Sequence, residues 1–169
     1  MRVYYEVKLR PWILSDLDYL VKYANNKKIA DNLTDAFPHP YRVEDGIKFI
    51  TKWSLDNPTK AFAIEVNGKP VGSIGIFPQT DIHSKNAEMG YWLAEEFWGF
   101  GITTHAVKQI VEYGFNTFDI NRIFARPFGS NIGSRKVLEK AGMKLEAKYE
   151  KTIFKNGIYL DELVYAVRT

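Results

Sequence analysis

Two glycines frame a short loop in the middle of the chain, within the run Trp98-Gly99-Phe100-Gly101-Ile102-Thr103-Thr104. The loop joins a strand-like run to a helical one. The first N–H groups of a helix have no partners inside that helix and lie at the positive end of its dipole, so a glycine loop here is an ordinary site for a phosphate group. The hydroxyls of Thr103 and Thr104 can cap the helix or bond a phosphate oxygen. The same glycines would also suit a tight strand-to-helix turn that binds nothing.

These residues match the patterns of two well-known nucleotide-binding loops poorly. A dinucleotide loop has the pattern Gly-x-Gly-x-x-Gly, but Thr104 stands at the third glycine position. Asp119 lies at a suitable distance along the chain for a ribose contact, yet the dinucleotide fold requires parallel crossovers, whereas hairpin signals predict antiparallel strands before the loop. A P-loop requires Gly-Lys-Ser or Gly-Lys-Thr, and the sequence contains neither. Both kinds of site are therefore disfavoured.

Three polar side chains elsewhere in the chain are candidates for chemistry. Glu88 falls in a strand-like run and shares a face with Gly90 and Trp92, where it is either a general base or a solvent-facing carboxylate. Asn131 and Ser134 fall in the first turn of one predicted helix, where Asn131 is by itself an N-cap. The chain has no cysteine and no Gly-x-Ser-x-Gly run, so neither a cysteine nucleophile nor a serine nucleophile of the elbow type is expected.

Composition limits the classes of protein to which the chain can belong. Its 169 residues, of which 46% are hydrophobic, can bury one core, and we expect a single domain over residues 1–169. The net charge of +3 is spread along the chain, so nucleic acid is not expected as a partner. Neither a run of ~20 apolar residues nor an N-terminal signal peptide is visible, which predicts a cytoplasmic protein that does not span a membrane. Without cysteine, and with His39, His83 and His105 outside metal-ligand spacing, no metal site is expected.

Hydrophobic periodicity predicts the elements that must position these residues. Strands are expected at residues 5–10, 61–66, 71–77, 88–93, 122–126, 143–154 and 159–167. Helices are expected from Ser15 to Ala24, around Ile47 to Trp53, at 103–118 and from Ser130 to Gly142. Asn67-Gly68 and Asn156-Gly157 are strong signals for hairpins. The order predicts an α+β fold, a three-layer α/β/α arrangement with a mixed, mostly antiparallel central sheet and helices on both faces.

The sequence around the glycine loop resembles the GNAT superfamily of acyltransferases, and within it the RimJ/RimL type. The most specific stretch is Glu88-Met89-Gly90-Tyr91-Trp92-Leu93 followed by residues 97–104, which is similar to the central strand and the pyrophosphate loop of that family. Residues 131–134, 137–143 and 156–161 are similar to later blocks of the family. The resemblance covers the whole chain and implies the GNAT fold.

The chain departs from the family pattern at several positions. Glu96 and Phe97 stand where the superfamily commonly has Gln and a basic residue. Phe100 stands where Lys or Arg is frequent, and His105 stands where the RimJ/RimL branch usually has Glu. The lack of a basic side chain at position 100 would leave phosphate recognition mainly to backbone amides.

The resemblance implies an N-acetyltransferase that moves the acetyl group of its cosubstrate, acetyl-CoA, to a primary amine by direct attack. It implies that Glu88 acts as the base and that the Ser134 hydroxyl donates a hydrogen bond to the departing thiolate. It also implies that the backbone at 92–94 pairs with the pantetheine arm and supplies an oxyanion donor. The cofactor-binding residues implied in this way are Trp92, Leu93, Ala94, Trp98, Gly99, Phe100, Gly101, Ile102, Thr103, Thr104 and Asn131.

Several questions stay open at the level of the sequence. The acceptor is either a protein N-terminal α-amine or a small-molecule amine, and the aromatic residues that are candidates for its pocket are Phe37, Tyr41, Trp53 and Tyr149. A homodimer is compatible with the sequence. The alternative function is a non-catalytic acyl-CoA-binding regulatory module with the same fold. An assay with acetyl-CoA and an amine panel separates the two, because only the enzyme releases free thiol.

Overall fold

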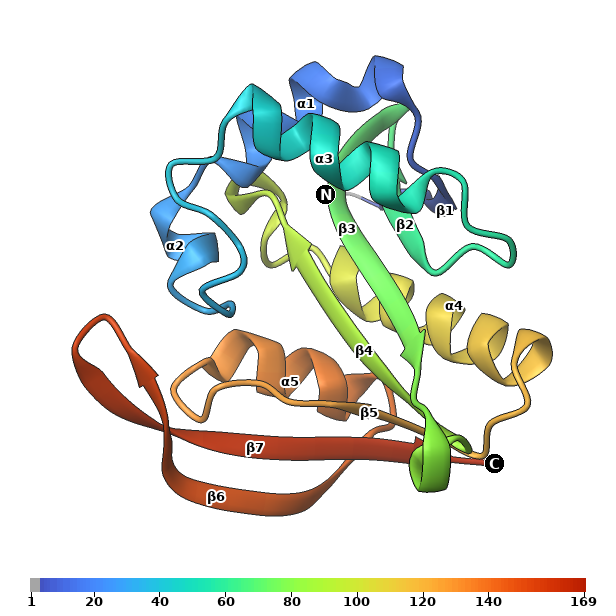
Figure 1. Cartoon of the computed structure of the whole chain (residues 1–169), viewed down its shortest axis with the longest axis vertical. Helices are drawn as coiled ribbons and strands as arrows, with labels where there is room; N and C mark the ends of the chain where they lie inside the picture. Colours follow the sequence, from blue (N-terminus) through green and yellow to red (C-terminus); the bar gives the residue numbers. More distant parts are fainter. Residues whose placement is uncertain (1–3) are drawn as a thin grey trace. The chain divides into compact units, whose positions relative to one another are not determined.

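The structure is a computed structural model that describes residues 4–169 (Figure 1). Its strands are β1 (Val7–Pro11), β2 (Ala61–Val66), β3 (Lys69–Pro78), β4 (Asn86–Leu93), β5 (Arg122–Ala125), β6 (Lys144–Lys155) and β7 (Ile158–Arg168). Its α-helices are α1 (Leu17–Ala24), α2 (Lys27–Ala30), α3 (Val43–Trp53), α4 (Ile102–Thr117) and α5 (Ile132–Lys140). Short 3-10 turns are η1 (Leu14–Asp16), η2 (Asp81–His83) and η3 (Glu95–Phe97).

The strands form one mixed sheet. Within residues 4–169 the sheet has seven strands in the order β1-β2-β3-β4-β5-β7-β6. β1 pairs antiparallel with β2, β2 with β3, β5 with β7 and β6 with β7, whereas β4 and β5 run parallel. The parallel pair places Glu88 opposite Phe124. The predicted α+β fold class, with a mixed and mostly antiparallel sheet, is confirmed.

Both predicted hairpins are present. Asn67 and Gly68 connect β2 to β3 with φ angles of 51° and 75°, and Asn156 and Gly157 connect β6 to β7 with φ angles of 52° and 78°. Two successive residues with positive φ are the mark of a type I′ turn, whose twist matches that of the flanking strands. Asparagine and glycine adopt this conformation at the lowest energy. The local sequence therefore fixes both connections.

One short helix lies where the sequence predicted only a loop. The predicted strands and the helices at 103–118 and 130–142 agree closely with the observed bounds, but α2 was not predicted. Its N-cap is Asn26, whose side-chain oxygen accepts a hydrogen bond from the N–H of Lys28 at 2.9 Å. A helix of one turn is too short to show a periodic pattern, so hydrophobic spacing could not reveal it.

The chain divides into two compact units. The first unit comprises the residues up to Gly75 together with Tyr91–Ala106, and the second comprises Ile76–Gly90 and Val107–Thr169. In the first unit, α1 and α3 lie side by side and contact each other (Figure 1). Their apolar faces cover a buried cluster made by Trp12, Leu20, Ala24, Ile29, Tyr41, Ile50, Ala63 and Trp92. This cluster anchors the end of β4 that carries Trp92.

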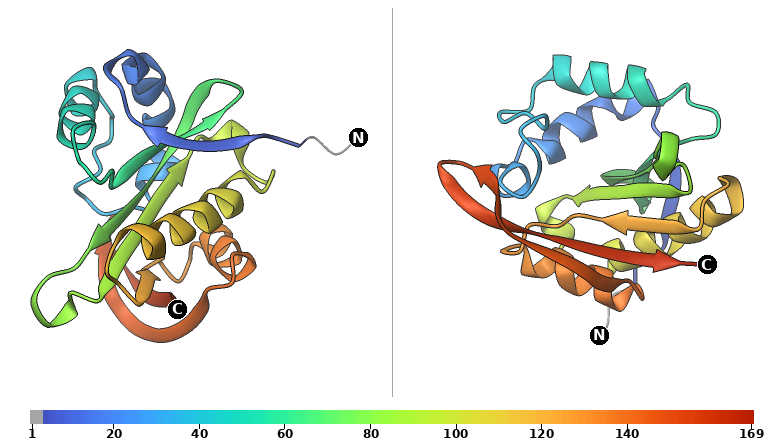
Figure 2. Two further views of the ribbon diagram at one scale, coloured as in Figure 1. Left: turned by 90° about the vertical axis from the view of Figure 1, so that its right-hand side faces the viewer. Right: turned by 60° about the horizontal axis from the view of Figure 1, so that its bottom comes forward.

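In the second unit, the helices cover one face of the strands. Gly114 of α4 lies against Ile76 and Ile123, and a Cβ atom at this glycine would stand 2.9 Å from Ile123 Cδ1. The Tyr165 hydroxyl of β7 donates a hydrogen bond to Glu139 of α5 at 2.8 Å. β6 and β7 extend as a long curved hairpin, drawn in red (Figure 2). Close helix-to-strand packing explains a glycine inside α4, although it lowers helix propensity by about 1 kcal/mol.

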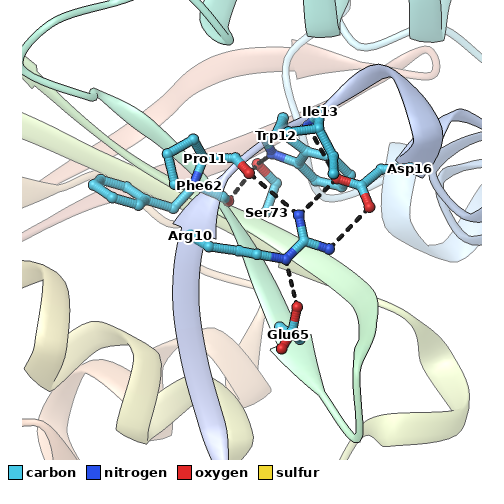
Figure 3. A network of polar contacts seen from close by, with 8 residues as sticks. All are labelled: Arg10, Pro11, Trp12, Ile13, Asp16, Phe62, Glu65 and Ser73. Carbon is cyan, nitrogen blue, oxygen red and sulfur yellow. Dashed lines mark hydrogen bonds and ion pairs between the residues drawn. The ribbon is translucent and has the colours of Figure 1, made fainter.

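A polar network locks β1 to the start of the first helical segment (Figure 3). Arg10 donates two hydrogen bonds to the carboxylate of Asp16, at 2.7 and 2.9 Å, and a third to Glu65. Asp16 is only 4% exposed and also accepts the N–H of Ile13 at 3.1 Å. The bond to Asp16 is the main cause that raises the pKa of Arg10, which stays cationic. Removing one partner would leave a buried charge poorly compensated.

Candidate active site

The glycine loop has the backbone conformation that its sequence predicts. Gly99 and Gly101 have φ angles of 83° and 79°, in the left-handed region that favours glycine. Within residues 4–169, a Cβ atom added at either glycine would meet no atom within 4 Å apart from its chain neighbours, so the loop faces open space there. The first intrahelical bond runs from His105 N to Gly101 O at 3.1 Å. The N–H groups at the start of α4 therefore precede the hydrogen-bonded ladder of that helix and are placed for an anion.

Aromatic side chains hold this loop from both ends. The indole N–H of Trp98 donates to the carbonyl of Leu93 at 2.7 Å, which ties the loop to the end of β4. The ring of Phe100 packs edge-on against Tyr5, with 5.4 Å between centroids. The rings of Tyr5 and Phe97 also pack edge-on, with 6.1 Å between their centroids. Phe100, which replaces a basic residue of the family pattern, thus has a packing role. The packing role of Tyr5 was not predicted, because its partners lie more than ninety positions away along the chain.

The turn before the loop is fixed by polar contacts. Glu95 of η3 accepts a hydrogen bond from the side chain of Asn26 at 2.8 Å and pairs with Lys28. Lys28 is the larger cause, and Asn26 the second, of a lowered pKa at Glu95. The carboxylate of Glu95 is therefore engaged by α2 and its cap. The short helix that the sequence did not predict thus supports the segment leading into the glycine loop.

The backbone at the end of β4 is partly used by the sheet itself. Ala94 N donates to Val71 O at 2.8 Å, so this N–H points toward β3. Successive N–H groups of a strand point to opposite edges, which directs the N–H of Leu93 away from β3. Gly72 lets β3 approach the end of β4 closely, since a Cβ atom at this position would overlap the Trp92 carbonyl and stand 3.1 Å from the Leu93 Cα. Of the N–H groups of Leu93 and Ala94, that of Leu93 is therefore the one directed away from β3.

Asn131 and Ser134 lie together at the start of α5. The side-chain oxygen of Asn131 accepts the N–H of Ser134 at 3.2 Å, so Asn131 is the N-cap that its sequence position indicates. Capping uses the oxygen and leaves the NH₂ group of Asn131 as the part suited to a ligand carbonyl. Ser134 is partly buried. The neighbouring Arg135 is committed to the structure, because it donates to Gly129 O at 3.2 Å.

Glu88 pairs with an arginine that sequence reasoning did not single out. Nε and Nη2 of Arg126 donate to the two carboxylate oxygens of Glu88 at 3.0 and 3.1 Å. Arg126 Nη1 lies 3.9 Å from Glu162, beyond hydrogen-bond distance. The bond to Glu88 is the main cause of a raised pKa at Arg126. The sequence indicated only that Arg126 ends the predicted strand at 122–126. It did not indicate which strand pairs with that one in parallel.

An open hollow of ≈520 Å³ lies over this part of the sheet. Phe124 and Tyr149 contribute rings to its wall, and Arg126 and Glu162 contribute charges. Arg122 also lines it, but its guanidinium is occupied: it lies over the Phe124 ring at 4.7 Å and donates to Glu146 at 2.8 and 3.2 Å. Tyr149 is thus the one of the four predicted pocket aromatics that lines this hollow.

The predicted site residues fall into both units. The first unit holds residues 92–94 and 98–104, which form the end of β4, the glycine loop and the start of α4. The second unit holds Glu88, Asn131 and Ser134, with Asn131 and Ser134 in one helix cap and Glu88 against Arg126. Across residues 4–169, no group of three or more His, Cys, Asp or Glu side chains is placed to hold a metal ion. None of the described helices is long and apolar enough to cross a membrane.

Comparison with known proteins identifies the family. Residues 6–144 match the acetyltransferase (GNAT) domain family. The chain is 31% identical over 150 residues to the uncharacterized N-acetyltransferase p20 of Bacillus licheniformis, covering 85% of this chain and 83% of that one. It is 25% identical over 156 residues to spermidine N(1)-acetyltransferase of Escherichia coli K12, covering 92% and 82%. The crystal structure of the microcin C7 self-immunity acetyltransferase MccE, in complex with acetyl-CoA and AMP, superposes with a TM-score of 0.81 at 28% identity, covering 97% and 93%. This chain belongs to the acetyltransferase (GNAT) domain family.

Proposed function

We propose that this protein is an N-acetyltransferase that transfers the acetyl group of acetyl-CoA to a primary amine. The observation that carries the proposal is the glycine loop: Gly99 and Gly101 leave open space in front of the first N–H groups of α4. A pyrophosphate fits there because it accepts hydrogen bonds from those groups and is attracted by the helix dipole. Membership of the acetyltransferase family supports acetyl-CoA as the source of that pyrophosphate.

The end of β4 offers a group for the thioester. In the proposed reaction the neutral amine attacks the carbonyl carbon, a C–N bond forms, the C–S bond breaks, and one N–H proton ends on the sulfur of coenzyme A. Negative charge develops on the carbonyl oxygen during attack, and one backbone N–H stabilises it. Leu93 N–H is our candidate, since Ala94 N–H is taken by Val71.

The finer features of the proposal rest on the resemblance. We assign the whole chain to one acetyltransferase domain of the RimJ/RimL type, with a protein N-terminal α-amine or a small-molecule amine as the acceptor. In this scheme Asn131 contacts the pantetheine arm and Ser134 donates to the departing thiolate. Glu88 takes the amine proton, directly or through water.

Release of free thiol tests the proposed function. The protein is incubated with acetyl-CoA and a panel of amines and peptides, and coenzyme A is measured with a thiol reagent. We expect thiol release that depends on the amine. Tight coenzyme A binding without release for any acceptor would instead favour the non-catalytic acyl-CoA-binding module.

Ser134→Ala is expected to lower kcat about tenfold while the dissociation constant of coenzyme A changes little. The hydroxyl is proposed to act on the thiolate that forms during the reaction, so its loss affects the transition state more than the bound ground state. Ser130→Ala, an exposed serine just before the same helix, is the matched control and should retain wild-type kcat. An unchanged kcat in Ser134→Ala would remove this residue from the catalytic set.

Glu88→Gln is expected to slow the reaction most for amines of high pKa at neutral pH. An amine with a pKa of ~10.4 is neutral in about one molecule in 2,500 at pH 7, so a base contributes strongly there and less at pH 9.5. We expect a loss in kcat/KM of about 100-fold at pH 7 that shrinks at pH 9.5. Glu112→Gln, on the exposed side of α4, is the control. Equal losses at both pH values would argue against a base.

A further inference from the structure

We propose that Arg126 selects amine acceptors that carry a carboxylate close to the amine. The proposal rests on the function proposed above and specifies its acceptor class. Its basis is the geometry of the Arg126 guanidinium, which lies in the second unit. Glu88 occupies the Nε and Nη2 edge of Arg126, with bonds of 3.0 and 3.1 Å. At the remaining edge, formed by Nη1 and Nη2, the acidic partner among the described residues is Glu162, whose carboxylate lies 3.9 Å from Nη1. Such an edge binds a second carboxylate through two parallel hydrogen bonds.

The depth of the charged groups favours this use. The Arg126 side chain is 48% exposed, whereas those of Glu88 and Glu162 are 29% and 23% exposed. The guanidinium is therefore the most solvent-accessible of these three charged groups. The pair with Glu88 also fixes the plane of the guanidinium before any ligand binds, which reduces the entropy lost on binding.

The charges around the hollow are balanced rather than of one sign. Glu146 is held between Arg122 and Arg168, and these contacts lower its pKa, with Arg168 the larger cause. Of the charged side chains that line the hollow itself, the guanidinium groups of Arg122 and Arg126 are matched by the carboxylates of Glu146 and Glu162. A bare polyamine would leave Arg126 facing an added positive charge. A zwitterion matches both signs: its carboxylate meets Arg126 and its ammonium group faces Glu162 and Glu88.

The rings beside the charges leave room for such a ligand. Phe124 and Tyr149 contribute apolar surface to the hollow of ≈520 Å³, which is large enough for an amino acid or the first residues of a peptide. Arg122 does not compete for the ligand, because it already donates to Glu146 and to Asn86, the latter at 3.0 Å. Arg126 is thus the guanidinium of the hollow that is both exposed and incompletely paired.

Matched acceptor pairs test the proposal. L-Alanine and β-alanine are compared with their amides, and a Ser-Asp-Ala peptide amide with its Ser-Asn-Ala counterpart. These arms distinguish an α-carboxylate from a side-chain carboxylate. The amine of an amide has the lower pKa and is more often neutral, so without carboxylate recognition the amide would react faster. We expect the carboxylate member of at least one pair to have a kcat/KM about tenfold higher than its amide.

Variants show whether Arg126 causes the preference. Arg126→Gln should abolish the preference for the carboxylate members, so that each amide reacts at least as fast as its acid, and Arg126→Lys should retain part of the preference. Arg168→Gln removes the same charge from the same sheet without lining the hollow and should keep the wild-type ratio. A wild-type enzyme that does not prefer the carboxylate members overturns the proposal. So does an Arg126→Gln enzyme that slows both members equally, because the residue would then act only through Glu88.

Direct binding separates this inference from the proposed function. NMR titration of the protein with each unreacted acid and its amide, in the presence of coenzyme A, measures recognition without turnover. We expect the carboxylate ligands to bind the wild type at least tenfold more tightly than Arg126→Gln. Absence of any thiol release would count against the acetyltransferase function while this titration still decides the role of Arg126. Equal binding of acid and amide by the wild type would refute the role of Arg126 even if both are acetylated.

Discussion

Asp16→Ala is expected to lower the free energy of unfolding by about 2–3 kcal/mol. Asp16 is 4% exposed, accepts two hydrogen bonds from Arg10 and caps the backbone at Ile13 (Figure 3). Its removal leaves a half-buried guanidinium with Glu65 as its remaining acidic partner and leaves the N–H of Ile13 without its acceptor. The expected loss is therefore at or just below the lower limit of about 3 kcal/mol for broken buried ion pairs. Chemical denaturation followed by circular dichroism measures it.

A matched control is offered by an exposed ion pair in the same unit. Lys27 pairs with Asp31 along α2 at 2.8 Å, with the lysine side chain 67% exposed. Lys27→Gln should change stability by less than about 0.5 kcal/mol. The triple variant Arg10→Met, Asp16→Leu and Glu65→Gln should recover much of the loss, because it removes all three charges of the network together. An Asp16→Ala protein as stable as the wild type would show that the network contributes only geometry.

Gly101→Val is expected to weaken coenzyme A binding by about 30- to 100-fold, which corresponds to losing about 2–3 kcal/mol of hydrogen bonding to a charged group. Valine is strained at the φ of 79° found here. Its side chain would also project into the space in front of α4, where the described residues place no atom within 4 Å of the added Cβ apart from its chain neighbours. Isothermal calorimetry with coenzyme A measures the affinity without turnover.

Gly142 provides the control for backbone strain. It follows α5, has a φ angle of 91°, and an added Cβ there would likewise meet no atom within 4 Å. Gly142→Val should destabilise the protein by about 1–3 kcal/mol, as Gly101→Val does, but leave coenzyme A binding unchanged. If Gly101→Val bound coenzyme A as tightly as the wild type, the loop would be a structural turn and the phosphate would bind elsewhere.

The acceptor proposed for this chain can be compared with the acceptor named for one of its relatives. One relative, 25% identical, is a spermidine acetyltransferase, whose acceptor is a polyamine. In our proposal, the exposed guanidinium among balanced charges in the hollow beside Glu88 favours a zwitterion over a polycation. The acceptor assays therefore include both polyamines and amino acids, and Arg126 is the residue that should distinguish them.

Much of the fold follows from local sequence signals. The asparagine-glycine pairs fixed both hairpins, since these residues adopt positive φ angles with little strain. Alternating and helical periodicities located the strands and the long helix, because each buries one face. The short α2 and the burial of Asp16 were not visible. A single turn has no period, and a buried carboxylate depends on an arginine supplied by another element.

In the candidate site, too, some features follow from residues close together in the sequence, whereas others depend on contacts between distant residues. The type and spacing of residues 99–101 predicted a phosphate loop, and the structure gives both glycines positive φ angles facing open space. Asn131 was predicted as an N-cap and caps α5. The partner of Glu88 was not predictable, because Arg126 lies 38 residues away along the chain and is brought close by the parallel pairing of β4 with β5.

The sequence by itself determined the glycine loop, the hairpins, the helix cap and the family, because each depends on residues that are near one another along the chain. The tertiary structure decided which of these groups remain available. It committed Ala94 N–H to β3, Arg122 to Glu146, and Phe100 to Tyr5, and it left one edge of Arg126 open. Availability depends on neighbours in space, and strand pairing brings those neighbours from distant positions in the sequence.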